Sequence, residues 1–316
     1  MATYYDIFGQ KVQYLSSDPS PVTEGQVWYN STSNTAKVQG FSSGAWSSGG
    51  ALPAPIGANS GSGSTTAGFS MGGGTGPVPS YVSATNTYDG TSWTGAPAMV
   101  FSSAYAGACG TIPTTLYAGG DGNAPGASNT YNGTSWTSIT ALGFNGYQIK
   151  AAGDSANAFA AQGYYSSSGR TWDGSSWTTN TAVPQHNYDT TAVGTYNDAT
   201  FLGGNAVSGG AFSNAHLNWN GSSWSSRTAI PLSGSGVGSS NNAPTSSFWA
   251  QISAPTTLNW DGSSWTTVGS LSTPRVNGGS GGSSAAEGFL AGGPTVGSTT
   301  TEEFASGPVT KTITTS

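Results

Sequence analysis

The stretch Leu258-Asn259-Trp260-Asp261-Gly262-Ser263-Ser264-Trp265-Thr266 places an Asp-Gly pair between two tryptophans. Asp-Gly and Asn-Gly pairs are common between antiparallel strands, because these residues tolerate the positive backbone angles of a tight turn. Trp260 precedes the turn and Trp265 follows it. We therefore predict a β-hairpin at this point, with one aromatic side chain on each strand.

Four further copies of this pattern occur earlier in the chain, at residues 88–93, 131–136, 172–177 and 219–224. The copies define two sets of repeat residues, the turn glycines and the second tryptophans: Gly90, Gly133, Gly174, Gly221, Gly262, Trp93, Trp136, Trp177, Trp224 and Trp265. Successive second tryptophans stand 41 to 47 residues apart. Such a period is typical of propeller blades or of helical repeats, and the sequence has no helical pattern.

A second element precedes most of these hairpins, an apolar strand that ends in a glycine pair. It occurs at residues 69–74, 116–120, 201–204 and 289–293, whereas residues 159–164 hold one glycine and residues 248–253 hold none. The order of apolar strand, Gly-Gly, aromatic-Asp-Gly and Trp resembles the kelch repeat. The resemblance covers residues 52–316 and implies an all-β, kelch-like β-propeller with four antiparallel strands in each blade.

The number of blades depends on where the repeats end. Six units end near Trp93, Trp136, Trp177, Trp224, Trp265 and Ile313. We predict six blades, because six self-contained units need no strand from the N-terminal residues. The alternative is a seventh blade, in which residues 27–46 supply three strands ending at Trp46 and residues 309–315 supply the fourth.

The N-terminal residues differ from the repeats. Residues 26–51 are predicted to form a β-meander, and Gly25-Gln26-Val27-Trp28-Tyr29-Asn30 with Gly44-Ala45-Trp46 resembles a module near the N-terminus of bacteriophage tail and other structural proteins, especially of marine phages. Residues 1–25 are predicted to form an attachment strand and a proline-containing linker. An uncovered strand needs a partner. Another subunit, another virion protein or the rim of the same propeller could cover its apolar residues, Ile7, Phe8, Val12, Tyr14 and Leu15.

Composition excludes several classes of partner. The net charge is −6, and the seven Lys and Arg residues are scattered along the chain. A nucleic-acid partner is not expected, because phosphate binding requires a basic stripe. No apolar run reaches membrane-spanning length, and the N-terminus has no signal-peptide pattern. We expect no membrane insertion and no export by a signal peptide.

Few residues in this chain could perform chemistry. It has two histidines, one cysteine and no catalytic or phosphate-binding motif. We therefore expect no enzymatic activity, no cofactor and no metal site. Asp89, Asp173 and Asp261 are interpreted as turn formers, with calcium binding as a weaker alternative.

Two functional hypotheses follow. The first is a virion structural protein, assembled in the host cytoplasm, whose propeller loops recognise a host-surface glycan or protein. Its partners would be other virion proteins and further copies of itself. The second is a cellular carbohydrate-binding propeller, either a lectin or an inactive relative of a hydrolase, whose exposed aromatic residues stack on sugars.

Overall fold

The computed structural model describes residues 12–22, 25–75, 80–237, 247–251, 255–275, 277–293 and 297–313, and these residues contain strands and loops but no helix. The chain divides into two compact units. The larger comprises residues 46–305, and the smaller comprises residues 1–45 together with 306–316. These units differ from the expected domains, because the smaller one combines both ends of the chain.

The larger unit contains five four-stranded antiparallel sheets, whose strands follow one another in chain order. The first two sheets consist of β4 (Ser60–Ser64), β5 (Ala67–Met71), β8 (Thr85–Tyr88) and β9 (Trp93–Ala96), then β11 (Gly107–Cys109), β12 (Thr115–Ala118), β14 (Ser128–Tyr131) and β15 (Trp136–Ile139). The third and fourth consist of β16 (Lys150–Gly153), β17 (Ala158–Gly163), β18 (Ser166–Trp172) and β19 (Trp177–Asn180), then β21 (Thr191–Thr195), β22 (Asp198–Leu202), β24 (His216–Trp219) and β25 (Trp224–Ser226). The fifth consists of β26 (Gly236–Val237), β27 (Ser247–Gln251), β28 (Thr257–Trp260) and β29 (Trp265–Val268).

Short two-stranded sheets lie in the connections between these strands. They pair β6 (Gly74–Thr75) with β7 (Ser80–Tyr81), β10 (Ser103–Ala104) with β13 (Asp121–Gly122), and β20 (Asn187–Tyr188) with β23 (Asn205–Ala206).

The last sheet draws on both ends of the chain. Its order is β30 (Gly279–Ser284), β31 (Glu287–Ala291), β32 (Thr301–Thr312), β3 (Thr35–Ser48), β2 (Val27–Asn30) and β1 (Gln13–Leu15). The expectation of six self-contained repeats is therefore wrong, because the last repeat supplies three strands and β3 lies beside β32. The expected three-stranded meander is also wrong, since residues 35–48 form one continuous strand.

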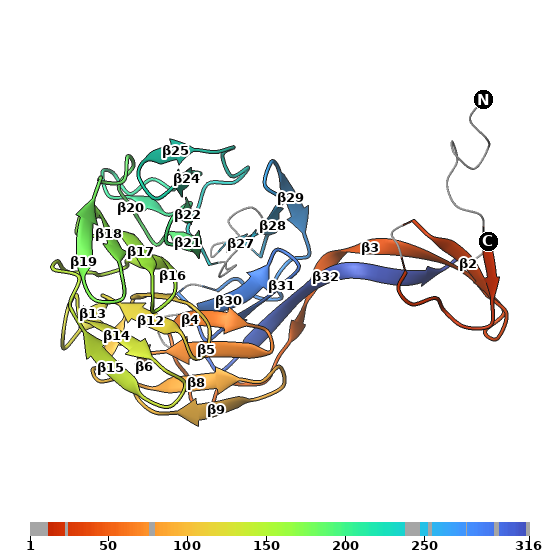
Figure 1. Cartoon of the computed structure of the whole chain (residues 1–316), viewed down its shortest axis with the longest axis horizontal. Helices are drawn as coiled ribbons and strands as arrows, with labels where there is room; N and C mark the ends of the chain where they lie inside the picture. Colours follow the sequence, from red (N-terminus) through yellow and green to blue (C-terminus); the bar gives the residue numbers. More distant parts are fainter. Residues whose placement is uncertain are drawn as a thin grey trace. The chain divides into compact units, whose positions relative to one another are not determined.

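The first strands of the sheets lie side by side, and glycine permits this close approach. A Cβ on Gly61 of β4 would lie 2.3 Å from the backbone nitrogen of Ser280 in β30. A Cβ on Gly107 of β11 would lie 2.8 Å from the nitrogen of Ala151 in β16. Small residues are therefore required at these positions of the first strands. The outer strands spread apart, which gives an all-β, propeller-like arrangement (Figure 1).

The predicted hairpins form with the aromatic residues directly opposite each other. Tyr88 pairs with Trp93, and Trp260 pairs with Trp265. The first aromatic is the more deeply buried: the exposed fraction is 2% for Tyr88 and 7% for Trp93, and 2% for Trp260, whereas Trp265 is only partly buried. In these two hairpins the first aromatic is therefore the more completely enclosed by the core.

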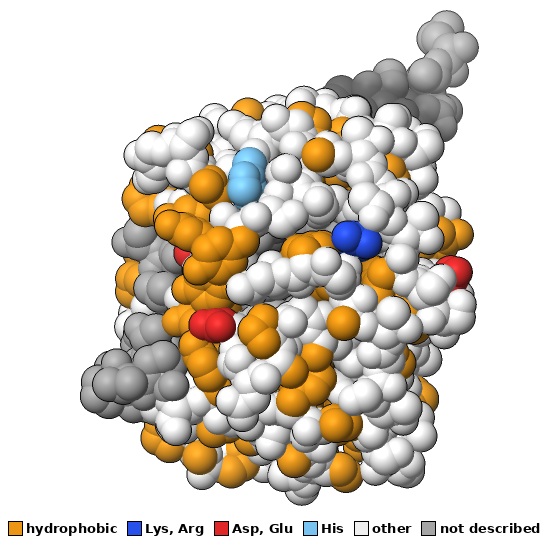
Figure 2. All heavy atoms as spheres, turned by 90° about the vertical axis from the view of Figure 1, so that its left-hand side faces the viewer, with side chains coloured by type: hydrophobic (Ala, Val, Ile, Leu, Met, Phe, Trp, Pro, Cys, Tyr) orange, Lys and Arg blue, Asp and Glu red, His pale blue; other side chains and the backbone are white. Residues whose placement is uncertain are grey.

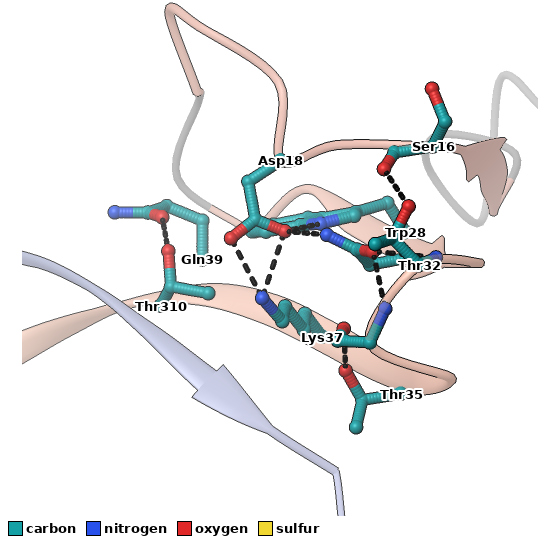
Figure 3. A network of polar contacts seen from close by, with 10 residues as sticks. Ser16, Asp18, Trp28, Thr32, Thr35, Lys37, Gln39 and Thr310 are labelled. Atoms are coloured by element: carbon teal, nitrogen blue, oxygen red, sulfur yellow. Dashed lines mark hydrogen bonds and ion pairs between the residues drawn. The ribbon is translucent and has the colours of Figure 1, made fainter.

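In the smaller unit, the described part of the N-terminal segment is fastened to its own chain. β1 pairs in parallel with β2. The carboxylate of Asp18 accepts hydrogen bonds from the indole of Trp28 at 2.9 Å and the amide of Asn30 at 2.7 Å, and it pairs with the ammonium of Lys37 at 2.7 Å (Figure 3). The residues around Pro19 are thus held against the β2–β3 hairpin and do not form an independent linker.

The C-terminal strand completes this unit. The backbone N–H of Ile313 donates to the carbonyl of Ala36 at 2.7 Å, and the hydroxyl of Thr310 donates to the side chain of Gln39 at 3.1 Å. Within the smaller unit, the two chain ends are therefore parts of one structure.

Candidate functional site

The two ends of each sheet carry different loops. The turn between the third and fourth strands lies beside the turn between the first and second strands. A Cβ on Gly174, for example, would lie 3.2 Å from the carbonyl oxygen of Ala156, and one on Gly221 would lie 3.2 Å from Asn197. In an antiparallel sheet the connection between the second and third strands must then lie at the opposite end, so each sheet separates two sets of loops.

The Asp-Gly and Asn-Gly turns share one hydrogen-bond pattern. Each begins with a side-chain oxygen that accepts from the two following Ser or Thr N–H groups, at 2.8 Å in both bonds of Asp173. Asn132 makes the same two bonds at 2.9 Å. Only the glycine has a positive φ, for example 90° at Gly174 and 95° at Gly133. These contacts are those of turn-forming side chains.

The repeat glycines lie in these turns, at Gly90, Gly133, Gly174, Gly221 and Gly262. Of the second tryptophans, Trp93 and Trp136 are buried, while Trp46, Trp177, Trp224 and Trp265 are partly buried. Several reach a neighbouring sheet, since the indole N–H of Trp177 donates to the carbonyl of Thr140 at 3.0 Å and that of Trp224 to the carbonyl of Thr181 at 3.2 Å. The repeat residues thus have structural contacts.

The structure describes three of the five apolar residues predicted to need a partner in the N-terminal strand. Ile7 and Phe8 lie outside the described residues. Val12 is 58% exposed, Tyr14 is 76% exposed and stacks on Tyr29 at 5.2 Å between ring centroids, and Leu15 is partly buried.

At the end of the sheet opposite to these turns, the third sheet differs from the first in the connection from β17 to β18, because it has no glycine pair there. In the first sheet, Gly72 and Gly73 have φ values of 59° and 105° and lead into a long connection. The third sheet lacks this pair. Its strands continue until Gly163 pairs with Ser166, with a register shift after Ala161. The residues left at the tip of this hairpin are Tyr164 and Tyr165, which are 41% and 63% exposed.

These two residues belong to a cluster of tyrosines from three successive repeats, hereafter the tyrosine face: Tyr105, Tyr147, Tyr164, Tyr165 and Tyr188. Ring centroids are 5.2 Å apart for Tyr105 and Tyr147, 5.9 Å for Tyr147 and Tyr165, and 5.0 Å for Tyr164 and Tyr188. Most of these contacts are edge-to-face, an arrangement that aromatic rings favour. On the face drawn in Figure 2, hydrophobic side chains gather near a histidine and acidic side chains.

Backbone hydrogen bonds hold the tip of this hairpin in place. The N–H of Tyr164 donates to the carbonyl of Tyr147 at 3.0 Å. The carbonyl of Gly163 lies 2.8 Å from the ring nitrogen Nε2 of His186, which donates in the tautomer that suits this contact. Tyr164 and Tyr165 are therefore oriented before any ligand arrives, which lowers the entropic cost of binding.

A small pocket adjoins the tyrosine face at Tyr105. Its volume is about 20 Å³, and residues from several repeats line it. Five lining residues share a left-handed backbone that is uncommon outside glycine, with φ between 52° and 58°: Ala58, Tyr105, Gln148, Asp189 and Asn277. Each precedes the first strand of its sheet, so one backbone feature repeats around the pocket. Non-glycine residues in this conformation cluster at functional sites.

Acidic groups dominate the electrostatics beside the tyrosine face. Asp121 accepts a hydrogen bond from the hydroxyl of Tyr81 at 2.6 Å, and Asp189 accepts one from the amide of Gln148 at 2.7 Å. Burial, together with Asp189 and Asp121, raises the pKa of Tyr105. Burial likewise raises the pKa of Tyr147 to about 12, with contributions from nearby tyrosines and these same aspartates.

Among the described residues, Lys150 lines the pocket together with Asp189. Burial lowers the pKa of Lys150, and the nearby Asp189 opposes this shift. Burial raises the pKa of Asp189, against the effect of Lys150 and of hydrogen bonds from Asn205 and Gln148. The charges of Lys150 and Asp189 therefore offset each other in part.

The described residues contain no group of three or more His, Cys, Asp or Glu side chains placed to hold a metal ion. Across the same described ranges, no helix is long and apolar enough to cross a bilayer.

Comparison with known proteins identifies a fold. The sequence matches no protein-family model and no curated protein sequence. Structural comparison, by contrast, finds 234 matching chains. One of them, "Structure of YjhT", superposes with a TM-score of 0.61 at 14% identity, covering 83% of this chain and 96% of that one. This likeness supports the propeller-like fold and does not extend to function.

Proposed function

We propose that the larger unit is a six-bladed ring closed by β3. The five four-stranded sheets and the β30-β31-β32-β3 group would be the six blades. Two observations support closure: Gly61 of the first sheet lies against Ser280 of the last, and the indole N–H of Trp93 donates to the hydroxyl of Thr301 in β32 at 2.9 Å. The N-terminal residues would then complete the sixth blade rather than form a seventh.

We infer that this protein is an exposed structural component of a virion, with loops that recognise the host surface. The tyrosine face is the observation that carries the recognition role, because it places exposed, pre-oriented aromatic rings on loops. Tyrosine supplies a large amphipathic contact area with little conformational freedom to lose. The virion assignment draws support from the resemblance of residues 25–46 to a module of bacteriophage structural proteins.

In this proposal the protein is not an enzyme and requires no cofactor. The smaller unit would join the particle, through other virion proteins or further copies of this chain. The exposed Val12, which precedes β1, and the exposed Tyr14 on β1 are the described residues best placed for such a contact.

The experiment that tests the proposal is mass spectrometry of purified particles. Finding the protein at a fixed copy number in the particles, exposed to protease on their surface, would support it. A cellular carbohydrate-binding propeller is the alternative, which the tyrosine face favours equally. Absence from purified particles, together with presence in uninfected cells, would favour that alternative.

A further inference from the structure

We propose that the tyrosine face binds a neutral saccharide, with one pyranose ring stacked on the rings around Tyr165 and a polar arm directed to the adjoining pocket. This inference rests on the proposed recognition function and names the class of ligand.

Two rings of the tyrosine face are exposed to solvent. Tyr164 and Tyr165 are 41% and 63% exposed, although their partners Tyr105, Tyr147 and Tyr188 are half-buried. A pyranose presents C–H groups, which carry partial positive charge, on its flat face. The face of an aromatic ring is negative, so the two surfaces attract each other while both remove apolar area from water.

Buried polar oxygens line the pocket. Among the described residues, the side-chain oxygens of Asn59, Gln148 and Thr190 are buried without a hydrogen-bond partner, and all three residues lie in the lining beside Tyr105. Their residues are 6%, 7% and 1% exposed. An unpaired buried acceptor costs about 1–3 kcal/mol, so a ligand hydroxyl that donates to it gains affinity.

The size of the pocket decides how such a ligand lies. A volume of about 20 Å³ holds one water molecule or a hydroxyl-bearing arm, and it is far too small for a sugar ring. The ring must therefore remain outside, over the tyrosines, while a bridging water or a hydroxyl group of an adjoining sugar unit reaches the pocket. Tyr105 both lines the pocket and belongs to the tyrosine face, so it connects the two.

The charged side chains of the pocket bear on the charge of the ligand. Among the described residues that line it, Lys150 and Asp189 carry opposite charges. The lining therefore has no excess positive charge to pair with a sugar carboxylate or sulfate, whereas sugar hydroxyl groups can hydrogen-bond to its polar side chains. Neutral saccharides are accordingly favoured over sialylated, uronic or sulfated ones.

The test uses the purified full-length protein on an array of neutral and acidic glycans, followed by saturation-transfer NMR with each glycan that binds. We expect neutral glycans to bind and their ring protons to receive saturation. Tyr165→Ala should weaken binding at least tenfold, and Tyr164→Ala should also weaken it. Tyr196→Ala is the matched control, because Tyr196 is 39% exposed on the β21–β22 turn at the opposite end of its sheet. Circular dichroism and melting curves verify that each variant is folded.

Three results would overturn the inference: no neutral glycan binds, only acidic glycans bind, or the folded Tyr164→Ala/Tyr165→Ala variant binds as the unmodified protein does. The last result would still leave host-surface recognition through other loops intact. Conversely, glycan binding that depends on Tyr165 in a protein absent from particles would contradict the virion role alone.

Discussion

The indole N–H of Trp46 donates to the hydroxyl of Thr257 at 2.8 Å, although the two residues stand 211 positions apart. Trp46 lies near the end of β3, and Thr257 begins β28 in the preceding sheet. Trp93 makes the equivalent bond to Thr301, which begins β32. The N-terminal strand thus presents its tryptophan to a neighbouring sheet as the repeat tryptophans do.

Replacement of Trp46 tests this role. Trp46 also packs on Phe304, with 5.4 Å between ring centroids. Because it is partly buried, Trp46→Ala should lower the free energy of unfolding by about 2–3 kcal/mol, somewhat less than for a fully buried tryptophan. Trp46→Phe retains most of the packing and should cost about 1 kcal/mol for the lost hydrogen bond. Denaturant titration measures both. An unchanged midpoint in Trp46→Ala would show that β3 adds little to the last sheet.

The two aromatic residues of one hairpin should differ in their contributions. Trp172 is 2% exposed, whereas its cross-strand partner Trp177 is partly buried. We expect Trp172→Ala to cost about 3–5 kcal/mol and Trp177→Ala about 1–2 kcal/mol. Each variant serves as the other's control in the same denaturation experiment. Equal losses in the free energy of unfolding would mean that side-chain exposure does not determine the relative contributions of the two tryptophans.

The turn aspartates should make the protein sensitive to strong acid. Hydrogen bonds from Ser176 and Ser175 lower the pKa of Asp173 to about 2, and equivalent bonds lower the pKa of Asp89 and Asp261. A lowered folded-state pKa adds stability above the unfolded value near 4, and this stability is lost as pH falls through the folded value. Melting temperature should therefore fall between about pH 4 and pH 2.

A triple Asn variant separates this effect from general acid denaturation. Asn132 and Asn220 already make the same turn bonds as Asp173. Replacing Asp89, Asp173 and Asp261 by Asn should preserve the melting temperature at neutral pH and flatten its decline in acid. Some decline should persist, because hydrogen bonds from Lys37, Asn30 and Trp28 lower the pKa of Asp18 to about 2. An identical acid profile in the variant would refute this assignment.

Protonation of His216 should lower the stability of the folded protein at milder pH. Its Nδ1 donates to the carbonyl of Thr228 at 2.9 Å, and its ring lies edge-on to Trp260 at 4.6 Å. Burial lowers its pKa to about 4. The unfolded chain therefore binds a proton between about pH 6.5 and 4 that the folded protein does not, so stability falls as pH decreases through this range.

The expected loss across that range is on the order of 3 kcal/mol. His216→Phe keeps an aromatic ring between Trp260 and Trp265 and cannot be protonated, so its stability should change less from pH 7 to pH 4.5. Denaturant titration at the two values provides the comparison. If the variant loses as much stability as the unmodified protein, another group must control the response.

The repeated hairpins could be predicted from sequence because their signals are local. Asp261-Gly262 lies within four residues of both tryptophans that it brings together. The combination of strands from both chain ends was considered only as a seventh blade, and the place of β3 in the last sheet could not be predicted in this way. The backbone N–H of Gly49, just after β3, donates to the carbonyl of Thr301 in β32 at 3.0 Å, and no local signal relates segments so far apart in the chain.

The tyrosine face was missed for a related reason. Tyr105, Tyr147 and Tyr188 come from three repeats, and none of them occupies a position of the repeat pattern. The available signal was the single glycine at residues 162–163 in place of a glycine pair. This deviation from the repeat places Tyr164 and Tyr165 at a hairpin tip. Local departures from a consistent pattern are expected at functional sites.

The adjacency of β3 and β32 also has a consequence for biosynthesis. The ribosome makes β3 well before β32, so the edge of β3 stays without its neighbour while more than 200 residues are added. During that interval the edge is open to pairing with the C-terminal strand of another nascent chain. Exchange of this strand between copies is therefore the assembly error to which this topology is most susceptible, and low concentration during refolding should suppress it.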